Sequence, residues 1–195
     1  MSRMPPAALA ALAALALACW QLRRLFAAQP RYALESRIGD LELRRYRPRV
    51  VAHTDVDADF SPALHDGFAR LSGYMFGGNE VSERMAMTEP VTASPASAGE
   101  GGGGYRVAVE MPERHEPPRP ADPRVRLDTM PVRRVAVLRF HGPIDAARIA
   151  RMEQRLLDAV AAAGLTAEGE TSFAAYDAPS TISPLRRNEV WVEVA

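Results

Sequence analysis

Short runs of alternating apolar and polar residues extend from Tyr32 to the end of the chain. Alternation of this kind is typical of β-strands that bury one face. It predicts a strand around Leu41 and Leu43, and further strands over residues 50–56, 85–91, 105–111, 133–140, 172–176 and 188–194. The Gly-rich stretch 99–104 predicts a hairpin loop, and the Pro-rich stretch 112–123 predicts a surface loop.

Two segments repeat apolar residues at helical spacing instead. The first opens at Ser61-Pro62, where serine is a favoured cap and proline a favoured first helical residue, and it ends at Gly77. The second is capped by Asp145 and ends at Gly164. The apolar stripes of the two predicted helices are Leu64, Phe68, Leu71 and Met75, and Ile149, Met152, Leu156 and Val160.

The order of these elements repeats along the chain. Each predicted helix follows one strand and precedes two more, and residues 49–52 correspond weakly in sequence to residues 133–136. We therefore predict an α+β domain built from two β-α-β-β-like halves, with two helices flanking a mostly antiparallel sheet. A cleft is expected where the halves meet.

An apolar segment precedes this domain. The Ala/Leu run Ala7–Trp20 is shorter than the roughly 20 residues of a spanning helix and matches the core of a signal peptide in length. Arg23 and Arg24 stand where a signal peptide carries small neutral residues, which favours an uncleaved helical anchor over cleavage. A degenerate lipobox that ends at Cys19 is a further alternative.

These features divide the chain into residues 1–29, an N-terminal hydrophobic anchor or signal segment, and residues 30–195, the folded domain. The protein is thus expected to be anchored in a membrane by a single N-terminal helix, or exported. Positive charge flanks both sides of the apolar run, so the orientation across the membrane stays open.

The composition of the chain excludes some classes of partner and of metal site. The chain has 24 basic residues, all of them arginine, and 24 acidic ones, so it has no overall basic field and we expect no nucleic-acid partner. The single cysteine excludes an intrachain disulfide framework and a zinc site made of several thiolates.

Catalytic and metal motifs fail when they are tested in detail. The alternating Asp55, Asp57 and Asp59 are similar to a calcium loop, but Phe60 replaces the turn glycine and Asp66 the final glutamate. Neither a phosphate-binding loop nor a hydrolase nucleophile elbow occurs. We therefore predict no enzyme and no catalytic residues. Metal-binding spacing is also absent among the histidines, which are His53, His65, His115 and His141.

Four blocks of sequence, taken together, resemble one known family. They are residues 67–71 (GFARL), 85–91 (MAMTEPV), 176–179 (YDAP) and 186–191 (RRNEVW). In these blocks the chain resembles the SOUL/heme-binding protein family, and the resemblance extends from Tyr32 to Val194. It implies a distorted antiparallel β-barrel or sheet with two flanking helices, a gyrase-inhibitor-like shape. It also implies a monomeric domain that binds heme or another tetrapyrrole in an apolar cleft.

The same resemblance implies a location for the ligand, between the first helix and the loop before the last strand. Because residues 180–184 contain no cation, we expect weak anchoring of propionates and mainly hydrophobic binding. The candidate ligand-binding residues are His65, Phe68, Ser72 and Gly73 in the helix and Ile182 and Arg186 in the loop.

Alternatives remain for two of these residues and for the function. His65 is either an axial heme ligand or a solvent-exposed helix histidine. Arg186 either contacts propionates or bonds its own loop. The alternative function is a binding module for another amphipathic small molecule or a protein partner, with heme binding lost.

Overall fold

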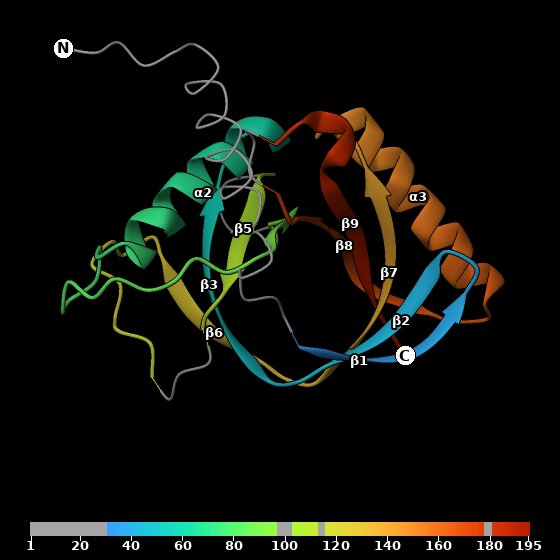
Figure 1. The fold of residues 1–195 in the computed structure, drawn as a ribbon, viewed down its shortest axis with the longest axis horizontal. Coiled ribbons are helices and arrows are strands. Elements are labelled where there is room, and N and C mark those ends of the chain that lie inside the picture. The colour runs from blue at the N-terminus through green and yellow to red at the C-terminus, as the bar shows by residue number, and fades with distance from the viewer. Residues whose placement is uncertain (1–30, 97–102, 113–115, 178–180) are drawn as a thin grey trace, which may run out of the picture.

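The computed structural model describes residues 31–96, 103–112, 116–177 and 181–195. In this part of the chain, nine strands form one antiparallel sheet in the order β1-β2-β7-β9-β8-β4-β5-β3-β6, and α2 and α3 lie on the outer side of its curve (Figure 1). The elements are β1 (Tyr32–Ile38), β2 (Leu41–Tyr46), β3 (Arg49–Val56), α2 (Phe60–Met75), β4 (Val91–Pro95), β5 (Tyr105–Glu110), β6 (Arg126–Met130), β7 (Arg133–His141), α3 (Ala146–Ala162), β8 (Ala167–Ala175), a 3₁₀ turn η2 (Ser183–Leu185) and β9 (Arg187–Val194).

The resemblance implied a distorted antiparallel β-barrel or sheet. The sheet is confirmed, and the barrel is wrong because the curved sheet stays open. Strands β1 and β6 each pair on one side only and form its two edges. All seven residues of β1 are exposed, and most of β6 is exposed. The two edge strands do not pair with one another, so the sheet does not close. The predicted N-terminal hydrophobic helix lies outside the described residues, and no helix within them is long and apolar enough to span a membrane.

The predicted order of elements is present twice, as β3-α2-β4-β5 and β7-α3-β8-β9. In each half the third strand lies between the first and the second, and the halves meet where β4 pairs with β8. We call this junction the seam. The strands that precede the halves are exchanged, because β2 pairs with β7 of the second half and β6 pairs with β3 of the first.

The segment 85–90 was predicted as the start of a strand, and this prediction is wrong. The strand β4 begins only at Val91. Met85 instead packs against the end of α2, where its backbone N–H donates to the carbonyl oxygen of Met75 at 2.7 Å. The segment then crosses to the seam, and the Thr88 hydroxyl bonds the carbonyl oxygen of Glu110 on the way.

The helix boundaries follow the prediction for α3 and differ for α2. Asp145 caps α3, because its side chain accepts a hydrogen bond from the backbone N–H of Arg148 at 2.8 Å. Helix α2 begins at Phe60 after Asp59, rather than after a cap at Ser61. Phe60 is buried against the rings of Tyr105 and Phe173, so its packing extends the helix by one residue beyond the predicted cap.

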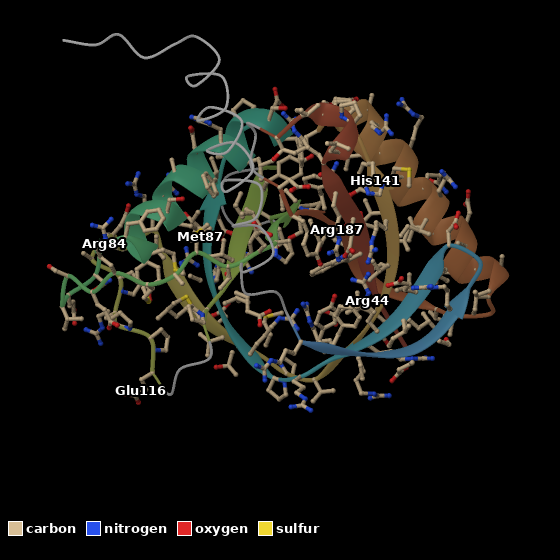
Figure 2. The ribbon with its side chains drawn as sticks, in the orientation of Figure 1. Arg44, Arg84, Met87, Glu116, His141 and Arg187 are labelled. Atoms are coloured by element: carbon tan, nitrogen blue, oxygen red, sulfur yellow. The ribbon has the colours of Figure 1, made fainter. Side chains whose placement is uncertain are left out.

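The two faces of the sheet have different environments. On the helix side, Val190, Val192 and Val194 of β9 belong to the core under α3, and a second core lies under α2. Alternate residues of the same strand, Glu189 and Trp191, point to the opposite side. We call this side the inner face. Figure 2 shows Arg44 and Arg187 there, within the curve of the sheet.

Candidate functional site

An apolar pocket of about 410 Å³ lies on the helix side of the sheet, between α2 and the segment that enters α3. Val91 of β4 and Ala175 of β8, which are register partners across the seam, contribute to its lining. The pocket therefore lies over the junction of the two halves. The remaining apolar lining comes from Phe60, Leu64, Phe68, Met87 and Ile144.

The polar lining of the pocket comes from several segments. Ser61 and His65 lie on α2, Thr88 and Glu89 on the segment before β4, and Tyr176, Asp177 and Arg186 around the loop before β9. Arg186 is held within its own loop, because its Nε donates to the carbonyl oxygen of Thr181 at 2.9 Å. Asp177 bonds the start of β9 through a hydrogen bond from the Arg187 backbone N–H at 2.6 Å.

The structure brings together three of the six candidate ligand-binding residues. His65, Phe68 and Arg186 line the apolar pocket. Ser72 and Gly73 do not, because they lie at least one turn further along α2, beyond the end of the pocket. Ile182 is also absent from the lining, and 61% of its surface is exposed.

Other lining residues were not selected from the sequence. Met87 and Val91 belong to the predicted strand 85–91 and were not named as ligand-binding residues, yet both are half-buried at the pocket. Tyr176 and Asp177 were likewise missed as site residues. All four belong to the sequence blocks that resemble the family, so these blocks were the signal that could have identified them.

A buried charge network fixes the Tyr176 wall of the pocket from behind. It consists of Glu42, Arg44, Tyr176, Arg187, Glu189 and Trp191. Glu189 is fully buried, and its carboxylate accepts hydrogen bonds from Arg44 Nη1 at 2.8 Å, the Tyr176 hydroxyl at 3.0 Å, and Trp191 Nε1 at 2.8 Å. Arg187 lies 3.8 Å above the centre of the Tyr176 ring.

The network is charged rather than neutral. Burial alone would raise the pKa of Glu189, but the hydrogen bonds and charge of Arg44, together with Arg187, outweigh it and lower this pKa to about 2. Burial and the nearby Glu189 carboxylate raise the pKa of the Tyr176 hydroxyl. Tyr176 thus stays protonated and Glu189 ionised at neutral pH, so the pair positions the pocket wall and exchanges no proton there.

The arrangement is suited to binding a flat apolar molecule. Aromatic and aliphatic side chains provide half of the lining residues, and the polar groups lie on α2, on the segment before β4 and around the loop before β9. Among residues 31–96, 103–112, 116–177 and 181–195, no three histidine, cysteine or acidic side chains converge to hold a metal ion. His65 is the one histidine in the described lining of the pocket.

Known proteins are similar to this chain in sequence or in fold. Heme-binding protein 2 of Homo sapiens is 28% identical over 160 residues, which cover 79% of this chain and 78% of that protein. The EcmrR C-terminal domain superposes with a TM-score of 0.55 at 12% identity, over 84% of this chain and 98% of that chain. A hydrolase from Listeria innocua gives a TM-score of 0.54 at 11% identity, over 83% and 94% of the two chains. At such low identity these two structures show the fold alone.

The profile of the SOUL heme-binding protein family matches residues 27–193. This match includes both halves, the seam and all the residues that line the apolar pocket. The chain therefore belongs to the SOUL heme-binding protein family.

Proposed function

We propose that the apolar pocket binds heme or a related tetrapyrrole and that the chain carries out no reaction of its own. The observation that carries the proposal is the lining of the pocket, in which α2, residues 87–91 and the segment around Tyr176 present apolar side chains to one space. The family match and the name of the human relative support the same ligand class.

The residues present fit such a ligand. Leu64 and Phe68 on α2 and Met87 before β4 offer apolar surface for a planar macrocycle. A pocket of about 410 Å³ holds only part of a porphyrin, so one edge projects beyond it. Bound heme would supply an iron centre, and the imidazole of His65, which lines the pocket, is a group that could ligate it.

The charges at the pocket favour binding through the apolar face. Arg186 is the one arginine in the described lining, and it already bonds the carbonyl oxygen of Thr181. The neighbouring carboxylates of Glu89 and Asp177 disfavour the approach of propionates. Exposed pairs between propionate and arginine contribute only about 0–1 kcal/mol each, so apolar burial dominates. Metal-free porphyrin is then expected to bind nearly as well as heme.

The test is titration of the purified full chain with hemin and with protoporphyrin IX. Binding is followed by absorption for hemin and by porphyrin fluorescence for the metal-free ligand. Phe68→Ala should weaken both ligands by about tenfold, because it removes apolar surface worth about 1–2 kcal/mol. Phe76→Ala is the matched control. Phe76 follows α2, is 52% exposed and does not line the pocket, so its removal should leave both affinities unchanged.

His65→Ala separates two modes of binding. If iron ligation is secondary, this variant changes the spectrum and affinity of the iron form alone. A site driven by ligation is indicated instead if His65→Ala abolishes hemin binding while protoporphyrin IX fails to bind throughout. If neither ligand binds at micromolar concentration, the proposal is wrong, and the better function is a module for another amphipathic molecule or a protein partner.

We further propose that residues 1–29 hold this domain at a membrane or direct its export, and that the domain is monomeric. The apolar run Ala7–Trp20 carries this proposal. Cell fractionation combined with N-terminal sequencing tests it. An intact, unprocessed chain found only in the soluble fraction would contradict both the anchor and the export signal.

A further inference from the structure

A second cavity, also of about 410 Å³, lies on the inner face of the sheet and reaches the same seam from the other side. We call it the inner cleft. It is lined by Thr92 of β4 and Ser172 of β8, and by Trp191 of β9. The apolar pocket and the inner cleft thus lie on opposite faces of the β4–β8 junction, and they share no lining residue.

Two ion pairs occupy equivalent positions of the two halves in this cleft. The register of the first half pairs Val51 with Glu110, and that of the second pairs Val135 with Glu193. Two residues before each valine stands an arginine that pairs with the carboxylate opposite. Arg49 Nε lies 3.2 Å from Glu110 Oε2, and Arg133 Nη1 lies 2.5 Å from Glu193 Oε1.

Each of the two guanidinium groups has a nitrogen that donates no hydrogen bond to any described residue. Arg49 is 91% buried at its side chain, and its Nη1 has no hydrogen-bond acceptor among the described residues. The same holds for Nε of Arg133. A buried donor without an acceptor costs about 1–3 kcal/mol, and more when the group is charged. The fold therefore contains unused hydrogen-bonding capacity that an oxygen-bearing ligand can satisfy.

The two arginines also influence one another. Burial lowers the pKa of Arg49, and the positive charge of Arg133 lowers it further. Like charges that face a common space are stabilised by an anion between them. Three of the four carboxylates that line the cleft have a partner: Glu110 and Glu193 pair with these arginines, and Asp128 Oδ2 lies 2.9 Å from Nε2 of the buried His53. Glu170 is the fourth.

We infer that the inner cleft binds an oxyanion, a carboxylate or a phosphate on a small organic molecule, between Arg49 and Arg133. The donors left unused on the two guanidiniums match the acceptors of such a group, since planar guanidinium binds carboxylate and phosphate with several parallel hydrogen bonds. Apolar contact for the remainder of the molecule comes from Val51, Met130 and Trp191. Because the cleft is lined by four carboxylates and three arginines, recognition depends on hydrogen-bond geometry rather than on net charge.

The experiment uses the full chain without heme or porphyrin. Citrate and inorganic phosphate are titrated at constant ionic strength, with chloride as the reference salt. Calorimetry gives the affinity, and the NMR signal of the Trp191 indole N–H reports on the cleft. Saturable binding of either probe, with a shift of that signal, is the expected result. Binding of citrate alone indicates an organic carboxylate, whereas binding of phosphate indicates a phosphate-bearing ligand.

Arg133→Gln should reduce this affinity at least tenfold, the loss expected for a hydrogen bond from a charged donor. Its matched control is Arg134→Gln. Arg134 is the next residue on β7, and its side chain pairs with Glu35 rather than lining the cleft. Arg133→Lys keeps the charge but loses the planar guanidinium. Its affinity for the probe should lie between those of Arg133→Gln and Arg134→Gln. The inference is overturned if neither probe binds more than chloride does, or if Arg133→Gln and Arg134→Gln bind equally while both are folded by circular dichroism.

Discussion

The hydroxyl of Tyr176 donates a hydrogen bond to Glu189 Oε2 at 3.0 Å, and this bond joins the wall of the apolar pocket to the buried charge network. Tyr176→Phe removes the bond and keeps the ring. Because the acceptor is an ionised, buried carboxylate, we expect the free energy of unfolding to fall by about 1.5–3 kcal/mol. Urea denaturation measures this loss, and porphyrin affinity should stay within about threefold of the wild type, since the apolar wall is retained.

An exposed ion pair provides the control for this variant. Arg119 and Glu80 lie 3.7 Å apart with most of both side chains in solvent. Glu80→Gln should therefore cost no more than about 1 kcal/mol. If Tyr176→Phe lowers the free energy of unfolding no more than Glu80→Gln does, the buried network does not stabilise the pocket wall.

Stability should fall in acid because of Glu189. Its pKa is about 2 in the folded protein, below the ordinary value of 4.5. A carboxyl group with a lowered folded pKa stabilises the protein above its unfolded pKa, and this contribution is lost as the pH falls toward the folded pKa. The urea midpoint should thus be constant above about pH 5 and decline between about pH 4.5 and 2.

Asp122 serves as the control in acid. Arg124 lowers its pKa to about 2 as well, but the Asp122–Arg124 pair lies near solvent, which screens it. Asp122→Asn should leave the dependence of the urea midpoint on pH nearly unchanged. Glu189→Asn or Glu189→Gln should make the midpoint nearly independent of pH between about pH 4.5 and 2. A wild-type midpoint that stays constant down to pH 2.5 would contradict the charged state of the network.

The two helices offer a matched test of capping. The Asp145 side chain accepts a hydrogen bond from the Arg148 backbone N–H, whereas Asp59, in the same place before α2, makes no such bond. Asp145→Ala should lower the free energy of unfolding by about 1 kcal/mol. Asp59→Ala should change it by less than about 0.5 kcal/mol. Equal losses in thermal or urea denaturation would show that the capping bond is not the source of the difference.

Two glycines of α2 should respond in opposite directions to alanine. A Cβ atom on Gly67 would lie 2.5 Å from Cβ of Val107, so Gly67→Ala must push α2 away from β5. We expect a loss of about 1–3 kcal/mol. A Cβ atom on Gly73 meets nothing within 4 Å, so Gly73→Ala should stabilise the protein by about 0.5–1 kcal/mol. A stable Gly67→Ala variant would mean that α2 packs less closely on the sheet.

Strands with one buried face were predictable from the sequence. In β7 and β9, apolar residues toward α3 alternate with residues on the inner face, and both strands were located to within about one residue. The edge strands β1 and β6 were missed, because largely exposed strands bury no face and show no such alternation. The alternation of residues 85–90 was misleading, since Met85 is buried by the end of α2 and not by a sheet.

The site was predictable only in part, for a related reason. His65 and Phe68 could be predicted as pocket residues from helical spacing and the family resemblance, because both side chains lie on one local element, α2. The network behind Tyr176 depends on Arg44 and Glu189, which are 145 residues apart and meet only through the pairing of β2, β7 and β9. Long-range pairing of this kind leaves no periodic signal in the sequence.

The exchange of β2 and β6 between the halves makes the domain a single cooperative unit. Neither half can complete its part of the sheet alone. The first half pairs with β6, which precedes the second half in the chain, and the second half pairs with β2, which precedes the first. A chain cut between β5 and β6 yields two fragments, of which the first lacks β6 and the second lacks β2. Such fragments should be unfolded separately and regain structure only when mixed, and the intact domain should unfold in one step without a half-folded intermediate.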